Sequence, residues 1–166
     1  MNNIIYRQAS VDDLEILVQS RVEFMNSFWG DTYQDKSIEL SAHLAAYFIK
    51  HLPAGDYISF LAFCDDTFAG VGGMHLREMP GGYRNMTGRV GYIMNMYTVP
   101  TFRRMGICKT ILDKLIQAGI QAGVSMFELH ATREGEMVYT HSGFQLHSEP
   151  TYRLFTQKKE NQLPYD

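Results

Sequence analysis

The pattern of hydrophobic and polar residues predicts two amphipathic helices near the start of the chain. Apolar side chains recur every three or four positions over residues 14–28 and again over residues 38–52, a spacing that places them on one side of a helix. Ser10 and Asp13 resemble an N-cap and its capping-box partner, and residues 53–55 end the second helix. The stripe of the first helix comprises Leu14, Leu17, Val18, Arg21 and Met25.

Runs of β-branched and aromatic residues predict six strands, and two further helices precede the last of them. Asp65 and Asp66 are typical of a tight turn between two strands, whereas residues 80–88 predict a long loop. This order predicts an α/β chain with one mixed sheet that is covered by helices on both faces. The predicted strands cover residues 4–9, 57–64, 67–79, 89–99, 125–131 and 149–155, and the two later helices cover residues 107–122 and Glu136–His141.

The composition is that of a soluble globular protein. Apolar residues make up 45% of the 166 residues and charged residues 20%, so we expect one domain over residues 1–166, with a frayed polar tail at 157–166.

A net charge of −3 argues against nucleic-acid and membrane partners. The start of the chain lacks an export signal, so a cytoplasmic location is expected. Cys64 and Cys108 lack metal-type spacing, and we expect free thiols and no metal.

Residues 99–108 combine the features of a phosphate-binding turn. The segment lies between a predicted strand and a predicted amphipathic helix. Pro100 turns the chain, and Gly106 lets a ligand approach the backbone without a side chain in the way. Arg103 and Arg104 add two permanent cations beside the unpaired amides of a helix start. The segment therefore predicts a site for a phosphate-bearing ligand.

Taken alone, this segment leaves other interpretations open. Basic residues at the start of a helix are also typical of a solvated surface. A nucleotide-binding module is a further alternative, but the chain lacks the G-x-G-x-x-G and G-x-x-x-x-G-K-[ST] motifs of such modules.

Two motifs resemble those of a known enzyme family. The run V-P-T-F-R-R-M-G-I-C is similar to the acyl-CoA-binding motif R/Q-x-x-G-x-G/A of the GNAT (GCN5-related) N-acetyltransferases, with Arg103, Gly106 and Cys108 at the motif positions. Cys108 departs from the usual Gly or Ala but is still compact. Residues 138–144, V-Y-T-H-S-G-F, resemble the family's L-Y-x-x-x-G-F element and follow at the customary distance. The resemblance extends through nearly the whole chain.

The resemblance implies a mostly antiparallel mixed sheet whose fourth and fifth strands splay apart, and acetyl-CoA as the cosubstrate. In the family, a bulge in the fourth strand frees amides for the thioester oxygen and the pantetheine arm, while amides at the following helix start cover the pyrophosphate. In this chain the first group would be Met96, Tyr97, Thr98 and Val99. The second group would be Met105, Gly106, Ile107, Cys108 and Lys109, together with Arg103 and Arg104.

The resemblance also implies a catalytic role for Tyr139, because the family's tyrosine approaches the CoA sulfur as a general acid or a hydrogen-bond donor. Packing in the core is the alternative for this side chain.

Asn95 is the second catalytic candidate, because asparagine is unfavourable within a strand and its side chain could orient the amine or a water. A hydrogen bond to a neighbouring side chain is the alternative for Asn95. No Asp or Glu lies in residues 89–99, so the general base is not identified. His75 is a weaker candidate for it, with packing in the strand as the alternative, and Glu128 and His130 could serve a water relay.

The predicted reaction transfers an acetyl group from acetyl-CoA to the primary amine of a small molecule or an amino acid. The amino terminus of a peptide is the rival acceptor, and a non-catalytic acyl-CoA sensor is the rival function. Acceptor specificity is expected from residues 24–33 and 80–89, with Glu23 and Asp31 as carboxylates that could attract a cationic amine. A last strand near an exposed sheet edge favours a homodimer.

Overall fold

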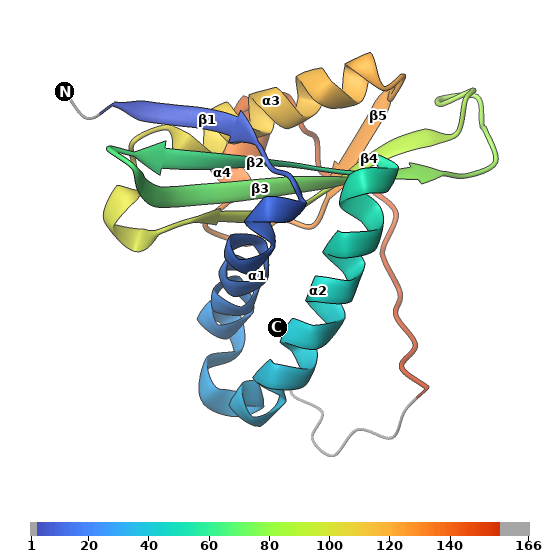
Figure 1. Cartoon of the computed structure of the whole chain (residues 1–166). Coiled ribbons are helices and arrows are strands. Elements are labelled where there is room, and N and C mark those ends of the chain that lie inside the picture. The colour runs from blue at the N-terminus through green and yellow to red at the C-terminus, as the bar shows by residue number, and fades with distance from the viewer. Residues whose placement is uncertain (1–2, 157–166) are drawn as a thin grey trace.

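The sheet has five strands in the order β1-β2-β3-β4-β5 and lies between two layers of helices (Figure 1). The computed structural model describes residues 3–156. Neighbouring strands are antiparallel except for β5, which is parallel to β4, so the predicted mixed and mostly antiparallel sheet is confirmed. The strands are β1 (Ile4–Gln8), β2 (Tyr57–Cys64), β3 (Thr67–Glu78), β4 (Arg89–Thr98) and β5 (Met126–Leu129).

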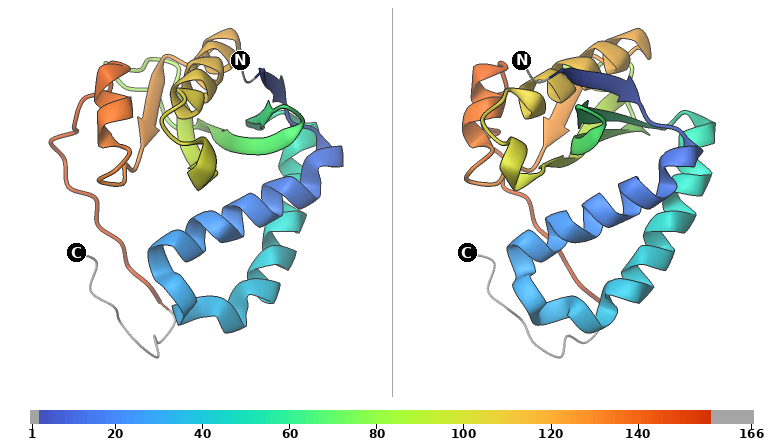
Figure 2. Two further views of the ribbon diagram at one scale, coloured as in Figure 1. Left: turned by 90° about the vertical axis from the view of Figure 1, so that its left-hand side faces the viewer. Right: turned by 60° about the vertical axis from the view of Figure 1, so that its left-hand side comes forward.

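The helices cover both faces of the sheet, as predicted. α1 and α2 lie together on one face, with their linked ends away from the sheet, and α3 and α4 lie on the other face (Figures 1 and 2). Across the part of the chain that is described, no helix combines the length and apolar character needed to cross a membrane. The α-helices are α1 (Leu14–Trp29), α2 (Ser37–Ala54), α3 (Ile107–Gln121) and α4 (Glu136–His141), and the 3₁₀ turns are η1 (Val11–Asp13), η2 (Gly30–Lys36) and η3 (Pro100–Phe102).

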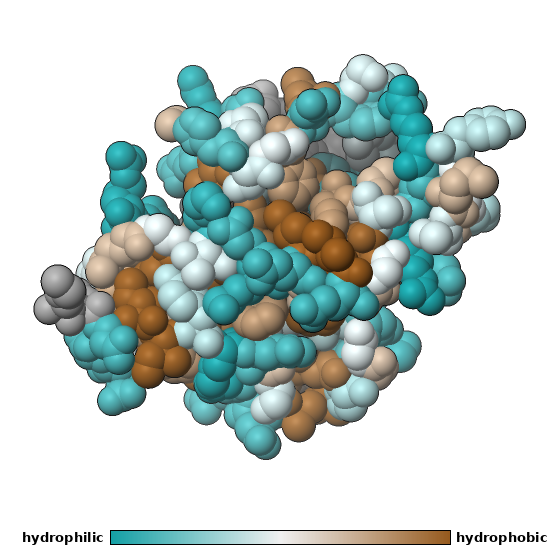
Figure 3. Space-filling view, turned by 90° about the horizontal axis from the view of Figure 1, so that it is seen from above, coloured by the Kyte–Doolittle hydropathy of each residue, from teal (hydrophilic) through white to brown (hydrophobic). Residues whose placement is uncertain are grey.

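One core lies between α3 and the sheet. The buried positions of α3 recur every three or four residues, so they form one stripe that packs on β2, β3 and β4. Seen from the α3 side of the molecule, hydrophobic residues reach the surface in groups that hydrophilic side chains separate (Figure 3). The buried α3 residues are Ile107, Ile111, Leu112, Leu115 and Gly119.

A second core lies on the opposite face, between the sheet and the helices α1 and α2. Tyr57 of β2 is 1% exposed, and its ring centre lies 5.3 Å from that of Phe48 and 5.5 Å from that of Tyr47, both on α2. Leu17 of α1 is equally buried in the same cluster. Aromatic packing of this kind fixes α2 against β2.

The predicted capping box at the start of the first helix is present. The Ser10 hydroxyl accepts a hydrogen bond from the Asp12 amide, and the Asp13 carboxylate accepts one from the Ser10 amide. The Arg7 guanidinium donates two further hydrogen bonds to Asp13, at 2.6 and 2.8 Å. These bonds hold the pKa of the buried Asp13 carboxyl below its usual range and join β1 to the start of α1.

Glycines in β3 allow close packing on both faces of the sheet. A side-chain carbon at Gly72 would lie 2.5 Å from Ile111 of α3 and 2.5 Å from the Met96 sulfur. A side-chain carbon at Gly73 would overlap the Tyr57 hydroxyl. The close packing of α3 on one face and of Tyr57 on the other face therefore requires glycine at these two positions.

A β-bulge interrupts β4 where the strand passes Gly72. Asn95 and Met96 of β4 face this single residue of β3, so the pairing of the two strands shifts by one residue. Asn95 takes up the extra length with a left-handed φ of +56°, a conformation that asparagine tolerates better than most residues.

The strands β4 and β5 part beyond the bulge. They pair only from Val90 to Ile93 on β4 and along Met126–Leu129 on β5, so residues 94–98 of β4 have no partner on that side within residues 3–156. The predicted splaying of the fourth and fifth strands is thereby confirmed. The gap exposes backbone groups that a regular sheet would have paired.

The predicted strand at residues 149–155 is wrong. Residues 145–156 form no strand and run from α4 towards the η2 end of the helix pair (Figures 1 and 2). A strand needs hydrogen-bond partners, and this segment turns away from the edge of β5 despite its apolar side chains. Tyr152 and Leu154 are accordingly 88% and 89% exposed. The predicted tail at residues 157–166 lies outside the described residues.

Substitution of Gly72 tests the dense packing on β3. We expect Gly72→Ala to lower the free energy of unfolding by about 1–3 kcal/mol, because the added carbon forces Ile111 or Met96 to shift. Urea denaturation measures this change. Gly82→Ala is the control, since a carbon at Gly82 meets nothing within 4 Å and its effect should stay below about 0.5 kcal/mol. Equal effects of the two substitutions would contradict the packing argument.

Candidate active site

The start of α3 presents a row of unpaired backbone amides. Gly106 caps the helix with a left-handed φ of +79°, and nothing lies within 4 Å of the position where its side chain would begin. Within residues 3–156, no amide from Arg104 to Lys109 donates to another residue, and Thr110 is the first to bond back into the helix. Free amides at the positive end of a helix dipole favour an anion such as phosphate.

Two arginines beside these amides have no carboxylate partner. Arg103 donates from Nε to the Thr98 carbonyl at 3.3 Å, which folds its side chain back over the end of β4. Neither Arg103 nor Arg104 forms an ion pair with any residue that the structure describes, whereas Lys109 pairs with Asp113 at 2.7 Å. The charges of the two arginines are therefore available to a ligand.

A cavity of about 940 Å³ extends from the start of α3 through the gap between β4 and β5 to α1. It brings together nearly all of the predicted site residues from three separate segments. Val99 and Met105 are the exceptions, and the Val99 amide donates instead to the Ala69 carbonyl at 3.0 Å. The predicted residues that line the cavity are Asn95, Met96, Tyr97, Thr98, Arg103, Arg104, Gly106, Ile107, Cys108, Lys109 and Tyr139.

Tyr139 lies on α4 and borders the cavity while its ring packs in the core. The side chain is 9% exposed, and its ring centre lies 6.1 Å from that of Phe144. Its hydroxyl forms no hydrogen bond within the described structure. Burial raises the pKa of Tyr139 well above its usual value of 10, so the hydroxyl keeps its proton at neutral pH.

Asn95 lies in the bulge and forms a hydrogen bond to a neighbouring side chain. Its Nδ2 donates to the Tyr57 hydroxyl at 2.9 Å. Its Oδ1 is buried and accepts no hydrogen bond from the described residues. A buried acceptor without a donor is costly, so the Oδ1 atom is a place where a ligand N–H would be favoured.

His75, the weaker candidate for the base, and the two residues of the predicted water relay lie in different surroundings. His75 does not line the cavity, and its Nδ1 lies 2.7 Å from the Tyr47 hydroxyl. Glu128 does not line it either and pairs with Arg77 at 3.3 Å. His130 does line the cavity, and its Nδ1 lies 2.8 Å from the Tyr92 hydroxyl.

Arg21 of α1 is a site residue that sequence reasoning did not assign. Its half-buried side chain lines the cavity, with the guanidinium carbon 5.5 Å from the centre of the Phe24 ring. It forms no hydrogen bond or ion pair with the described residues, and burial lowers its pKa from the usual value. The signal was an arginine within an otherwise apolar helical stripe, which is an unusual place for a charge.

The segments expected to set acceptor specificity behave differently from each other. Part of residues 24–33 lines the cavity through Phe24, Met25, Ser27 and Phe28. Residues 80–89 border a separate, smaller depression instead. Glu23 does not line the cavity and accepts a hydrogen bond from Tyr97 at 3.1 Å.

The fold, the parted strands and the amide-rich start of α3 are the features that the resemblance to acetyltransferases implies. Residues 20–144 match the model of the acetyltransferase (GNAT) family, and the chain belongs to this family. A search of curated proteins found no match.

Solved structures of acetyltransferases share the fold. A predicted acetyltransferase from Clostridium acetobutylicum, solved with acetyl-CoA, is 28% identical with a TM-score of 0.80, over 92% of this chain and 96% of that one. A GCN5-related N-acetyltransferase from Ralstonia eutropha JMP134 is 20% identical with a TM-score of 0.82, over 92% and 99% of the two chains. The aminoglycoside N-acetyltransferase AAC(6')-Iy, solved with CoA, is 19% identical with a TM-score of 0.65, over 96% and 97%.

Cys108 lines the cavity at a motif position where the family usually has Gly or Ala, and burial raises the pKa of its thiol. A protonated thiol is a poor nucleophile, so no acetyl-cysteine intermediate is expected. We predict that Cys108→Ala keeps its turnover number within about twofold of wild type. Steady-state kinetics and mass spectrometry of protein incubated with acetyl-CoA alone provide the measurement. Acetylated Cys108, or loss of turnover in the variant, would contradict this.

Proposed function

We propose that this protein is an N-acetyltransferase that transfers the acetyl group of acetyl-CoA to the primary amine of a small acceptor bearing an anionic group, such as an amino acid. The observation that supports the acceptor class is Arg21, a half-buried cation without an ionic partner in the described structure, in the part of the cavity away from α3. A carboxylate on the acceptor would compensate this charge.

The donor half of the proposed site rests on backbone geometry. Met96, Tyr97 and Thr98 follow the bulge on the stretch of β4 that has no β5 partner among the described residues, and amides of this stretch that point away from β3 would serve the thioester oxygen and the pantetheine arm. The amides at the start of α3, with Arg103 and Arg104, would hold the pyrophosphate. Val99 has a smaller part than expected in this proposal, because its amide is already bonded.

The reaction requires a neutral amine. An amine with a pKa of about 10 is roughly 99.9% protonated at pH 7, so a proton must leave before the nitrogen attacks the thioester carbon. We assign this proton to His130, directly or through a water, because its Nδ1–H can donate to the Tyr92 oxygen and leave Nε2 as the acceptor. The carbon–nitrogen bond then forms, the attacking nitrogen gives its second proton to solvent water, the carbon–sulfur bond breaks, and CoA leaves as the thiolate.

Tyr139 is proposed to stabilise this leaving thiolate. Its hydroxyl keeps its proton at neutral pH and has no other partner within the described residues, so it can donate a hydrogen bond to the sulfur. A thiol has a pKa of about 8.5, so complete transfer of the proton from a tyrosine above pKa 10 is uphill. The proposed role is therefore a hydrogen bond that strengthens as negative charge develops on the sulfur.

Asn95 is proposed to position the acceptor. Its buried Oδ1 is free to accept a hydrogen bond from the attacking nitrogen, while the bond from Nδ2 to Tyr57 fixes the amide group. This assignment combines the two interpretations of Asn95. Its hydrogen bond to Tyr57 orients the side-chain amide, and the Oδ1 atom of that amide would contact the substrate.

A thiol-release assay with acetyl-CoA tests the proposed function. Amino acids, polyamines, aminoglycosides and short peptides serve as acceptors, and we expect amino acids to be the best because Arg21 repels purely cationic amines. No turnover with any acceptor, combined with tight acetyl-CoA binding, would favour a sensor. A preference for peptides would support the rival acceptor.

Substitution of Arg21 tests the acceptor class directly. We expect Arg21→Ala to raise the KM of an amino acid about 10- to 100-fold, because one charge-assisted contact is lost, and to leave the KM of acetyl-CoA unchanged. The same amino acid with its carboxylate converted to an amide should show little difference between wild type and variant. Arg84→Ala, in the loop outside the cavity, is the control. Equal losses for acid and amide would contradict the proposal.

Substitution of Tyr139 tests the stabilisation of the thiolate. Tyr139→Phe keeps the packing of the ring, so we expect the dissociation constant of acetyl-CoA to stay within about twofold while the turnover number falls about 10- to 1000-fold. Calorimetry and single-turnover kinetics measure the two quantities. Tyr83→Phe, fully exposed on a loop, is the matched control. An unchanged turnover number would remove Tyr139 from the mechanism.

A further inference from the structure

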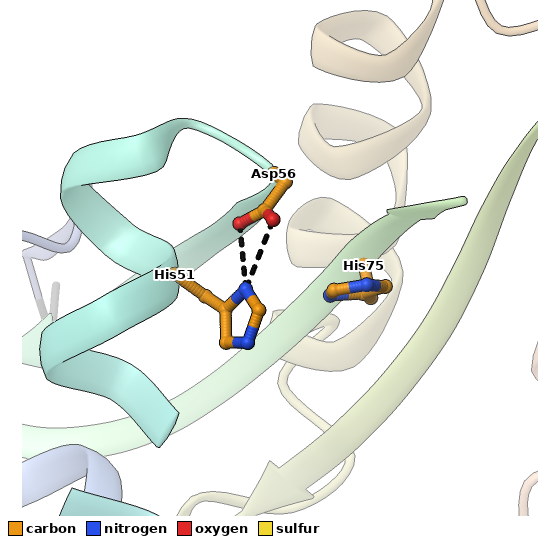
Figure 4. Close-up of side chains that lie close together, drawn as sticks. All are labelled: His51, Asp56 and His75. Atoms are coloured by element: carbon orange, nitrogen blue, oxygen red, sulfur yellow. Dashed lines mark hydrogen bonds and ion pairs between the residues drawn. The ribbon is translucent and has the colours of Figure 1, made fainter. Parts of the chain in front are cut away.

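Two histidines and an aspartate from three parts of the chain lie together outside the acetyl-transfer cavity. His51 is in the last turn of α2, Asp56 is in the connection to β2, and His75 is on β3 (Figure 4). One potential metal-ligating atom from each residue lies within 4.8 Å of the other two. None of the three side chains lines the cavity.

The backbone holds these three residues in register. Gly55 ends α2 with a left-handed φ of +76°, so the chain turns back and places Asp56 beside His51. The Asp56 carbonyl accepts a hydrogen bond from the Leu76 amide at 2.7 Å, which ties the connection to the residue after His75. Backbone hydrogen bonds therefore hold the three side chains close to one another.

The chemistry of the three side chains suits a borderline divalent metal ion. Imidazole nitrogens and a carboxylate oxygen are typical ligands of zinc, at about 2.0–2.2 Å from the ion, which places ligand atoms about 3.4 Å apart. Rotation of the side chains can bring atoms that are now within 4.8 Å to that spacing. Asp56 is 41% exposed, so water can complete the coordination.

The hydrogen bond to His75 favours the tautomer that binds a metal. The Tyr47 hydroxyl lies 2.7 Å from Nδ1 of His75 and its oxygen can accept a hydrogen bond from Nδ1–H, which leaves Nε2 free as a ligand. Arg77 is the nearby cation that opposes a metal, but it already pairs with Glu128 at 3.3 Å and lies over the Tyr92 ring.

We propose that His51, Asp56 and His75 bind one divalent transition-metal ion, with zinc as the best match, and that this ion fastens the end of α2 to β3. Nδ1 of His51 lies 2.9 Å from both oxygens of Asp56, a contact that holds the two side chains close together. The proposed role is structural, since the cluster contributes nothing to the lining of the cavity.

Calorimetric titration of the metal-stripped full-length protein with zinc chloride tests this site. We expect one zinc ion per chain, and at least a tenfold loss of affinity in each of His51→Gln, Asp56→Asn and His75→Gln. His43→Gln is the matched control, because His43 is also on α2 and beside a carboxylate, Glu39, at 3.9 Å, yet it does not belong to the three-residue cluster. Its affinity for zinc should equal that of wild type.

Thermal unfolding supplies a second measurement that does not depend on acetyl transfer. Zinc at about 100 times its dissociation constant should raise the Tm of the wild type by roughly 5–10 °C, and EDTA should reverse the shift. Circular dichroism shows whether each variant is folded before titration. Absence of zinc binding by the wild type, or equal affinity in the cluster variants and wild type, would overturn the proposal. These results leave the thiol-release assay untouched, so failure here and failure of the proposed function are distinguishable.

Discussion

The β-bulge at Asn95 and Met96 is the constraint on which the site depends. It adds one residue to β4 opposite Gly72, and β4 separates from β5 directly beyond Ile93. A regular strand would have paired its amides with β5 and closed the gap in which the cavity lies. Tyr57 holds the bulge through the Asn95 amide, and it can reach there because Gly73 has no side chain. The acetyl-CoA half of the proposed site thus depends on the packing of Tyr57 in the core between the sheet and the helices α1 and α2.

The local elements could be predicted because their signals are local. The helix of residues 107–122, the capping box at Ser10 and the tight turn at Asp65 each depend on neighbouring residues, and the structure contains all of them. The predicted strand at residues 149–155 failed for the opposite reason. Its residues are partly aromatic and β-branched, but a strand exists only where another strand offers hydrogen bonds, and the segment itself does not identify that partner.

The candidate site divides in the same way. Its donor half is a contiguous run from strand to helix, so the sequence around Gly106 specified most of it. The rest depends on tertiary placement. Arg21 looked like one member of an apolar stripe, and only the fold shows that it faces a cavity without a carboxylate partner in the described structure. His51, Asp56 and His75 have no motif spacing, because α2 and β3 meet only in the folded chain.

The two proposed sites are joined by a continuous series of contacts. His75 bonds to Tyr47, whose ring packs on Tyr57, and Tyr57 bonds to Asn95 in the bulge. Physical proximity alone does not couple two sites, since coupling requires an element with two arrangements that both ligands bias. Tyr57 is buried between helix and sheet, and the structure shows it in a single arrangement. An ion at the end of α2 would therefore stabilise the wall of the acetyl-transfer site without switching it on or off.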